Sequence, residues 1–150
     1  MRILLATDGS DHSRFAAEEC GKLASAIKDA RVKIITAIDN FTPMATDPFI
    51  TTEEFLEIVT QRIRENAEKS ISVAKEIVEN AVPGIETETE ILVGLPKKTI
   101  IEEAESWEAD LIMVGSHGYG FWGRKFLGSV SDAVVHHAPC SVWVARNKAG

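Results

Sequence analysis

The chain has 150 residues, of which 45% are hydrophobic and 26% charged, and its formal net charge is −7. This size and composition are those of one globular domain and exclude an intrinsically disordered chain. The acidic balance argues against nucleic acid or an acidic membrane surface as a partner, since both attract positive charge. No apolar run is long enough to cross a bilayer and no signal peptide is recognisable, which predicts a cytoplasmic location.

Apolar segments of two kinds alternate along the chain, and their order predicts the fold class. Segments with the pattern of buried strands alternate with segments of helical spacing. The predicted elements are strand 1–7, helix 13–27, strand 31–38, helix 51–81, strand 85–93, a helix that follows Pro96 with Ile100, Ile101, Ala104 and Trp107 on its inner side, strand 111–114, helix 129–137 and strand 141–145. Thr51 and Glu54 have the spacing of a capping box at the start of the second helix. Helices supply the crossovers that parallel strands need, so we predict one α/β domain over residues 1–150, a five-stranded parallel sheet flanked by four helices.

A glycine-rich loop follows the fourth strand. It reads Gly115-Ser116-His117-Gly118, then nine residues, then Gly128-Ser129-Val130-Ser131 at the start of a helix. Glycines let a backbone approach an anion closely, and free N–H groups at a helix start favour a phosphate. Taken alone, this pattern is equally compatible with a simple turn.

An ordinary P-loop is excluded, although residues 118–125 carry its glycine spacing. That motif needs Lys and then Ser or Thr after the last glycine, and here Arg124 and Lys125 occupy those places. We expect these two side chains to lend positive charge to a bound triphosphate.

The loop spacing, Gly-x2-Gly-x9-Gly-Ser, resembles the nucleotide-binding signature of the universal stress protein family. The segments 3–10, 128–131 and 137–144 resemble that family as well, so the resemblance covers the whole chain. It implies a doubly wound sheet of strand order 3-2-1-4-5 and membership of the ATP-binding branch. In that order the reversal lies between strands 1 and 4, which is where open α/β sheets bind ligands.

The resemblance also implies a set of binding residues for ATP, or for ADP or AMP. Asp8 would bind sugar hydroxyls or assist a magnesium or manganese ion held through the phosphates; the alternative is a turn aspartate bonding its own backbone. Ala37 would meet the adenine through its backbone, unless it is simply part of the core. The implied site comprises Ala6, Thr7, Asp8, Ala37, Val114, Gly115, Ser116, His117, Gly118, Gly128, Ser129, Val130 and Ser131.

The remaining reactive side chains form no catalytic or metal motif. His117 is either a phosphate ligand or a solvent-facing loop residue, and we expect His12 on the surface and the adjacent His136 and His137 in structural roles. Cys20 and Cys140 lie far apart in the sequence and are predicted to be buried thiols.

Phe121 and Trp122 depart from the family, whose loop usually carries small or charged residues here. Three interpretations are open: the two side chains cap the site, contact a partner or fold back onto the domain. The third is favoured.

The two edges of the predicted sheet differ. The third strand carries acidic side chains that disfavour pairing with a strand of another chain: Glu86, Glu88 and Glu90. The fifth strand is uncharged and apolar, and family members pair through it, so a homodimer is predicted through Ser141, Val142, Trp143, Val144 and Ala145.

The sequence thus predicts a dimeric adenine-nucleotide-binding protein of stress response or signalling, in which the nucleotide controls conformation or the choice of an unidentified partner protein. Efficient catalysis is not expected, and the protein is predicted to be at most a weak ATPase. One alternative is a slow hydrolase or pyrophosphatase-like enzyme of related fold, although the turn after the first strand lacks the paired glycines of that group. The other is a dimeric interaction module that binds no nucleotide.

Overall fold

Strands and helices alternate in the computed structural model, which describes residues 1–39, 53–118 and 127–147. The elements are β1 (Arg2–Ala6), α1 (Asp11–Ser25), β2 (Arg31–Ile38), α2 (Glu53–Ala81), β3 (Glu86–Val93), α3 (Pro96–Ser106), β4 (Leu111–Gly115), α4 (Ser129–His137) and β5 (Ser141–Ala145). Every predicted element is present, and the predicted and observed ends differ by at most two residues. The interpretations of Thr51, Phe121, Trp122, Arg124 and Lys125 concern positions outside the described residues.

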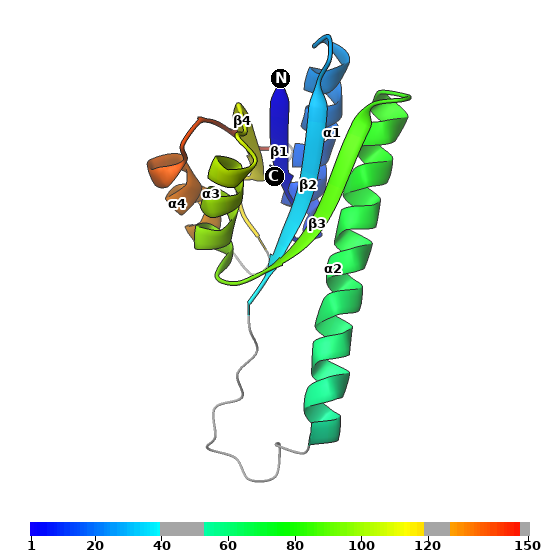
Figure 1. Cartoon of the computed structure of the whole chain (residues 1–150), viewed down its shortest axis with the longest axis vertical. Helices are drawn as coiled ribbons and strands as arrows, with labels where there is room; N and C mark the ends of the chain where they lie inside the picture. The colour runs from blue at the N-terminus through cyan, green and yellow to red at the C-terminus, as the bar shows by residue number, and fades with distance from the viewer. Residues whose placement is uncertain (40–52, 119–126, 148–150) are drawn as a thin grey trace.

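The strands form one parallel sheet of order β3-β2-β1-β4-β5, which confirms the predicted order. β1 lies in the middle, with Leu4 opposite Lys33 of β2 on one side and opposite Ile112 of β4 on the other. Helices α1 and α2 cover one face of the sheet, and α3 and α4 cover the other (Figure 1). β3 and β5 form the edges, as expected.

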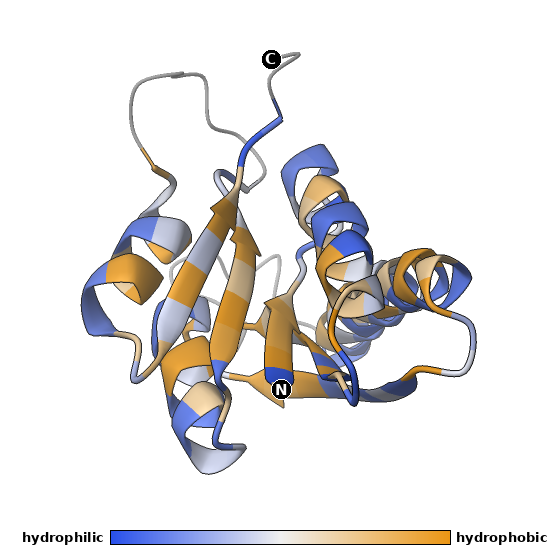
Figure 2. Ribbon diagram, turned by 90° about the horizontal axis from the view of Figure 1, so that it is seen from above, coloured by the Kyte–Doolittle hydropathy of each residue, from blue (hydrophilic) through white to orange (hydrophobic). Residues whose placement is uncertain are grey.

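The apolar core consists of two layers, because successive side chains of a strand point to opposite faces. Ile3 and Leu5 of β1 pack with the α1 and α2 layer, whereas Leu4 between them packs with the α3 and α4 layer, and all three are fully buried. Figure 2 shows apolar residues concentrated along the strands and on the helix surfaces that face them. The central strands are therefore held on both faces, as expected for a parallel sheet.

Helix α2 is longer than the sheet that it covers. Its 29 residues span about 43 Å, whereas a strand of eight residues spans about 26 Å. Its apolar stripe is buried only from Ala67 onward, and Phe55 and Ile58 are 41% and 58% exposed. Only the second half of the apolar stripe lies against the sheet, because the first half of α2 projects beyond the strands (Figure 1).

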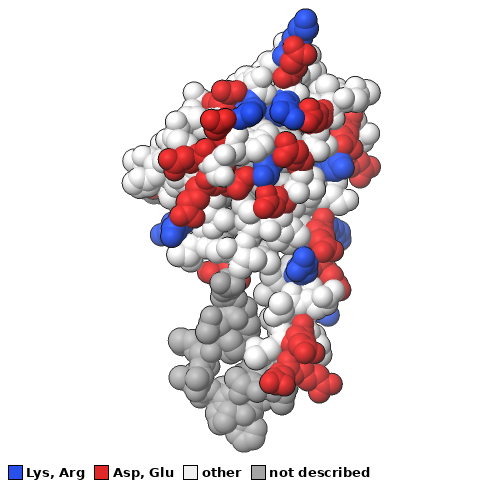
Figure 3. All heavy atoms as spheres, in the orientation of Figure 1, with Lys and Arg blue, Asp and Glu red and all other residues white. Residues whose placement is uncertain are grey.

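A buried lysine links β2 to the elements on either side of it. Lys33 is 9% exposed, and its Nζ lies 2.7 Å from a carboxylate oxygen of Glu90 on β3 and 2.5 Å from one of Glu103 on α3. Arg31 pairs with Glu86 on the same strand pair. Figure 3 shows basic side chains interspersed among more numerous acidic ones on the face of the molecule that carries β3. These pairs hold the edge strand, whose outward positions are otherwise acidic.

Both cysteines are free thiols, and they differ in burial. Cys20 lies in the core between α1 and the sheet, and this burial raises the pKa of its thiol to about 12. Cys140 is half-buried, and burial together with the charge of Asp110 raises the pKa of its thiol above the ordinary value. Since the thiolate is the reactive form, burial disfavours reaction at Cys20 in the folded protein. Of the helices that the structure describes, none combines the length and apolar character needed to span a membrane.

Candidate functional site

A cavity of about 430 Å³ opens at the carboxyl ends of β1 and β4, where the strand order reverses. This is the position at which doubly wound sheets place their ligands. All of the predicted binding residues except Ser116 line it. The lining residues are Ala6, Thr7, Asp8, Ser13, Ala37, Pro96, Ile100, Val114, Gly115, His117, Gly118, Gly128, Ser129, Val130 and Ser131.

Ser116 supports the cavity from behind its wall, where it is fully buried. Its carbonyl accepts hydrogen bonds from the backbone N–H of Gly128 at 2.9 Å and from the hydroxyl of Ser131 at 3.0 Å. Its own N–H donates to the carbonyl of Ala145 at 2.9 Å. One residue thus fastens the end of β4 to the start of α4 and to β5.

The turn after β1 is built from short polar side chains. The Ser10 hydroxyl caps α1 by accepting a hydrogen bond from the N–H of Ser13 at 3.3 Å, and one carboxylate oxygen of Asp8 accepts from the N–H of Ser10 at 3.0 Å. The turn interpretation of Asp8 is thus observed for this oxygen. The other oxygen faces Gly118, where an added Cβ would lie 2.7 Å from it. Asp8 is exposed at the cavity rim and able to meet a ligand as well.

Ser13 is a cavity residue that the sequence analysis missed. It is 3% exposed, accepts a hydrogen bond from the Thr7 hydroxyl at 3.1 Å, and donates to the carbonyl of Ser10 at 3.0 Å. The signal that could have revealed it is Ser10, whose type is preferred at a helix N-cap. Placing the helix start at Asp11 brings Ser13 into the first turn, beside the end of β1.

Helix α4 begins at the cavity without a side-chain cap. Its N-cap is Gly128, which has no side chain to satisfy the first N–H groups, and Ser129, Val130 and Ser131 follow along the cavity wall. In α1, by contrast, Ser10 supplies the cap. An uncapped helix start combines open N–H donors with the positive end of the helix dipole, which suits a phosphate or another anion.

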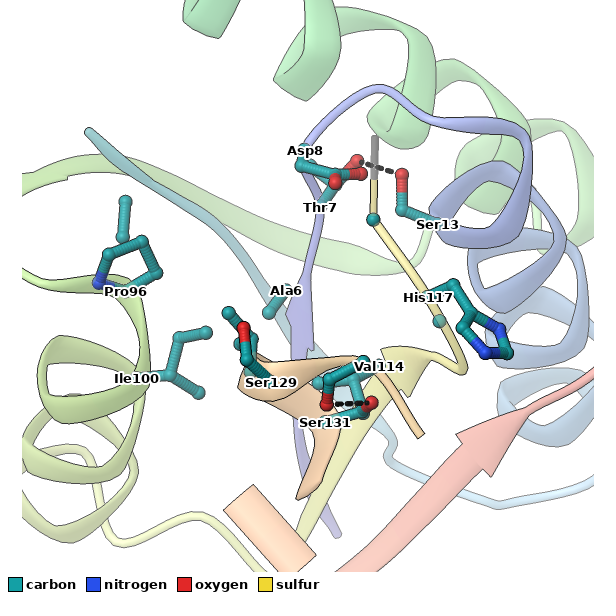
Figure 4. Close-up of a pocket in the computed structure, with 15 residues that line it drawn as sticks. Ala6, Thr7, Asp8, Ser13, Pro96, Ile100, Val114, His117, Ser129 and Ser131 are labelled. Atoms are coloured by element: carbon teal, nitrogen blue, oxygen red, sulfur yellow. Dashed lines mark hydrogen bonds between the residues drawn. The ribbon is translucent and has the colours of Figure 1, made fainter. Parts of the chain in front are cut away.

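The opposite end of the cavity is apolar. Pro96 and Ile100 come from α3, and Figure 4 shows them at one end, with Asp8, Ser13 and His117 at the other. Val114 is 3% exposed and contributes to the floor together with Ala37. Pro96 and Ile100 were not predicted as cavity residues, because the apolar spacing of Ile100 in its helix is the same for a core residue and for a residue that lines a pocket.

Gly115 permits the close approach of α1 to the end of β4. A Cβ at this position would lie 2.7–2.8 Å from three backbone atoms, the carbonyl carbon and oxygen of His12 and the nitrogen of Ser13. This contact brings the two histidine rings of the site together: the centres of His12 and His117 are 5.1 Å apart. The prediction that His12 lies on the surface was therefore too simple, since its side chain is half-buried against His117.

The residues predicted for dimerisation lie on β5 at the sheet edge. Ser141 and Trp143 are exposed, the latter by 39%, while Val142 and Val144 are half-buried against the α3 and α4 layer. Ala145 is 1% exposed and packs in the other core layer. In the described parts of the chain, no group of three or more His, Cys, Asp or Glu side chains is arranged to hold a metal ion.

Comparison with known proteins identifies the family. The model of the Universal stress protein family matches residues 1–146. A universal stress protein of Thermus aquaticus is 37% identical over 145 residues, covering 96% of this chain and 97% of its own. Among solved structures, universal stress protein UspA from Lactobacillus plantarum matches with a TM-score of 0.79 and 26% identity, over 97% of each chain. A universal stress protein in complex with cAMP matches with a TM-score of 0.70 and 25% identity, again over 97% of each chain. The chain therefore belongs to the universal stress protein family.

Proposed function

We propose that the cavity binds an adenine nucleotide, most favourably ATP, and that residues 1–150 form a single nucleotide-binding domain. The observation that carries the proposal is the junction of an apolar pocket with the uncapped start of α4 in one cavity. A nucleotide has the matching shape, with an apolar base at one end and anionic phosphates at the other. The complex of a related universal stress protein with cAMP supports the choice of an adenine nucleotide.

The polarity of the cavity sets the direction of the ligand. The base would lie against Ile100 and Pro96, near the carboxyl end of β2, where the backbone of Ala37 can meet its edge. The phosphates would lie at the opposite side, against the N–H groups at the start of α4 and the backbone of Gly118. Asp8, at the rim, would bind the sugar hydroxyls or assist a metal ion held through the phosphates.

A magnesium or manganese ion fits this arrangement as a companion of the phosphates. Asp8 is the acidic residue among the cavity-lining side chains that the structure describes, and carboxylates and phosphate oxygens are the ligands that such ions prefer. The metal would neutralise the negative charge of the phosphates, so that the phosphates and the Asp8 carboxylate can lie at the same end of the site.

The proposed role is a nucleotide-dependent switch in stress response or signalling, with slow or no hydrolysis. The hydroxyls of Thr7, Ser13 and Ser131 in the cavity lining are engaged in hydrogen bonds of the turn and the loop, which does not favour a role as nucleophiles. The weaker candidates are a slow hydrolase and an interaction module without nucleotide. A cavity that joins apolar and anion-binding ends argues against the second.

The first test is to extract the purified protein and identify any nucleotide it carries, followed by calorimetry with ATP, ADP, AMP and cyclic AMP. Gly118→Val is expected to lower nucleotide affinity about tenfold or more, because its side chain would meet the Asp8 carboxylate and fill the phosphate end. Gly84→Ala, at the opposite edge of the sheet, serves as the control and should bind normally. If the unaltered protein and Gly118→Val both fail to bind, the proposal is wrong.

We further propose that the protein is a homodimer joined through β5. The support is an exposed, uncharged edge strand that carries Trp143, since such an edge requires covering. Trp143→Lys is expected to shift the protein to monomer at micromolar concentration, as measured by analytical ultracentrifugation, because it would place two like charges in the interface. Val135→Lys, an exposed apolar residue of α4, is the matched control. A monomeric unaltered protein, or a dimer that persists in Trp143→Lys, would contradict the proposal.

A further inference from the structure

Strand β3 is the longer of the two edge strands, with eight residues against five in β5. The N–H of Gly94, at its end, donates to the carbonyl of Ile38 on β2 at 2.9 Å. Since the backbone groups of a strand alternate between its two sides, the even-numbered residues of β3 face β2 and the odd-numbered ones face outward. The outward N–H and C=O groups therefore belong to Thr87, Thr89, Ile91 and Val93. Such a row can pair with a further strand.

A groove of about 360 Å³ lies between this edge and helix α2. Its lining includes Ile71 of α2, which is 8% exposed, and Thr89 and Ile91 of β3. Ile91 packs against the core layer of α1 and α2, so the groove is on that face of the sheet. Because side chains alternate between the faces, every second side chain of a strand added at this edge would lie over the groove. The two isoleucines suit an apolar side chain there.

The opposite face of the same edge is acidic, since the intervening positions of β3 are Glu86, Glu88 and Glu90. Glu86 pairs with Arg31 and Glu90 with Lys33, whereas Glu88 is exposed and forms no ion pair among the described residues. Figure 3 shows this face, on which acidic side chains outnumber basic ones. The other side chains of an added strand would lie beside these carboxylates, which favours lysine or arginine at those positions.

The glutamates argue against a second copy of β3 as the partner strand. Residues opposite each other in paired strands share a face, so two antiparallel β3 strands would place glutamates opposite glutamates. Like charges in that position destabilise a sheet, whereas a strand with basic residues there would be attracted. The same side chains thus prevent self-association at this edge and select a cationic partner.

We propose that the β3 edge binds an extended segment of another protein, in which basic residues alternate with apolar ones, as a sixth strand of the sheet. The backbone of the segment pairs with Thr87, Thr89 and Ile91, its basic side chains lie beside Glu88, and its apolar side chains lie over the groove at Ile71. In this mode the main-chain hydrogen bonds give affinity and the alternating side chains give specificity. The surface is separate from the nucleotide cavity at β1 and β4, so the inference does not depend on nucleotide binding.

The test uses the full chain and a fluorescein-labelled peptide of the length of β3 that alternates arginine with valine. Fluorescence anisotropy is expected to show saturable binding, about tenfold tighter than that of a peptide of the same composition whose arginines are consecutive. In hydrogen exchange followed by NMR, the amides of Thr87, Thr89 and Ile91 should gain protection from the peptide, while the even-numbered amides of β3 are already protected. No binding below about 1 mM, or equal binding of the two peptides, overturns the proposal.

Two pairs of variants test the backbone and the charge separately. Thr89→Pro removes an outward N–H without removing a hydrogen bond to β2, and proline is tolerated at such edge positions. It should weaken binding of the alternating peptide about tenfold, whereas Thr89→Ala, which keeps the N–H, should bind normally.

Glu88→Lys should also weaken peptide binding about tenfold, because it places a like charge beside the arginines. Glu18→Lys, at an exposed position of α1, makes the same change in net charge and should have little effect. The proposal is overturned if Glu88→Lys binds the peptide as tightly as Glu18→Lys does. It is also overturned if folded Thr89→Pro binds as tightly as Thr89→Ala.

Discussion

Gly115→Ala is expected to lower the free energy of unfolding by about 2–3 kcal/mol, because the new Cβ would lie 2.7–2.8 Å from backbone atoms of His12 and Ser13. No flexible side chain can move aside there, so β4 or the first turn of α1 must shift. For a chain of this length, the melting temperature should fall by about 4–12 °C in a thermal denaturation followed by circular dichroism. Nucleotide affinity should fall as well, since the displaced turn carries Asp8 and Ser13 to the cavity.

Gly84→Ala is the control for this prediction. Gly84 has nothing within 4 Å of an added Cβ, but its φ of +82° is unfavourable for alanine, which costs about 1 kcal/mol. It precedes β3, at the edge of the sheet opposite the cavity, so nucleotide binding should be unaffected. A Gly115→Ala protein that melts no lower than Gly84→Ala and binds nucleotide normally would show that the contact with α1 is not required.

Lys33→Met is the second change for which a large effect is expected, a loss of about 2–4 kcal/mol in the free energy of unfolding. The variant leaves Glu103, whose side chain is 15% exposed, without its cation, and an unpaired buried charge is strongly destabilising. Chemical denaturation with urea measures the loss. Replacing Glu103 by Leu in the same protein should recover most of it, because both buried charges are then removed.

The matched control is Lys22→Met, in which the lysine side chain is 68% exposed and paired with Glu19 on the surface of α1. Its unfolding should be indistinguishable from that of the unaltered protein. If the two substitutions lowered the free energy of unfolding equally, the ion pairs of Lys33 would contribute no more to stability than a surface ion pair does.

The contribution of Lys33 should also depend on pH in a defined direction. Burial lowers the pKa of Lys33, but its hydrogen bonds with Glu103 and Glu90 and the charges of these carboxylates outweigh it and raise the pKa above the ordinary value of 10.5. The folded state therefore binds the lysine proton more tightly than the unfolded chain. The stabilisation is present in full below pH 10.5 and is lost as the pH rises through the folded-state pKa, so the gap to Lys33→Met should narrow in alkaline solution.

The order of elements and the position of the cavity could be predicted from the sequence, because they follow from alternating periodicity and from the place of the polar turns. The residues that were missed depend on distances between elements. Ile100 has the spacing of a core residue. Whether it lines the cavity instead depends on the distance between α3 and β1 in the folded structure. His12 was assigned to the surface because its contact with His117 depends on Gly115, more than a hundred positions later.

How far a helix extends beyond the sheet that it covers also cannot be predicted from the spacing of its apolar residues. The apolar spacing at Phe55 and Ile58 continues that of Ala67 and Ile71, yet only the latter pair is buried. Periodicity reports which side of a helix is apolar, and the length of the neighbouring strands decides how much of that side is covered.

The central position of β1 has a consequence for how the protein is made. Of the five strands, β1 is synthesised before the others, so it can pair with β2, through registers such as Arg2 with Arg31, before Leu111 of β4 is available to its other edge. Until β4 has been synthesised, any sheet formed by the earlier strands has an open edge at β1, the middle strand of the folded protein. An open strand edge is a template for pairing between chains, so we expect this protein to be most prone to aggregation before β4 has paired with β1.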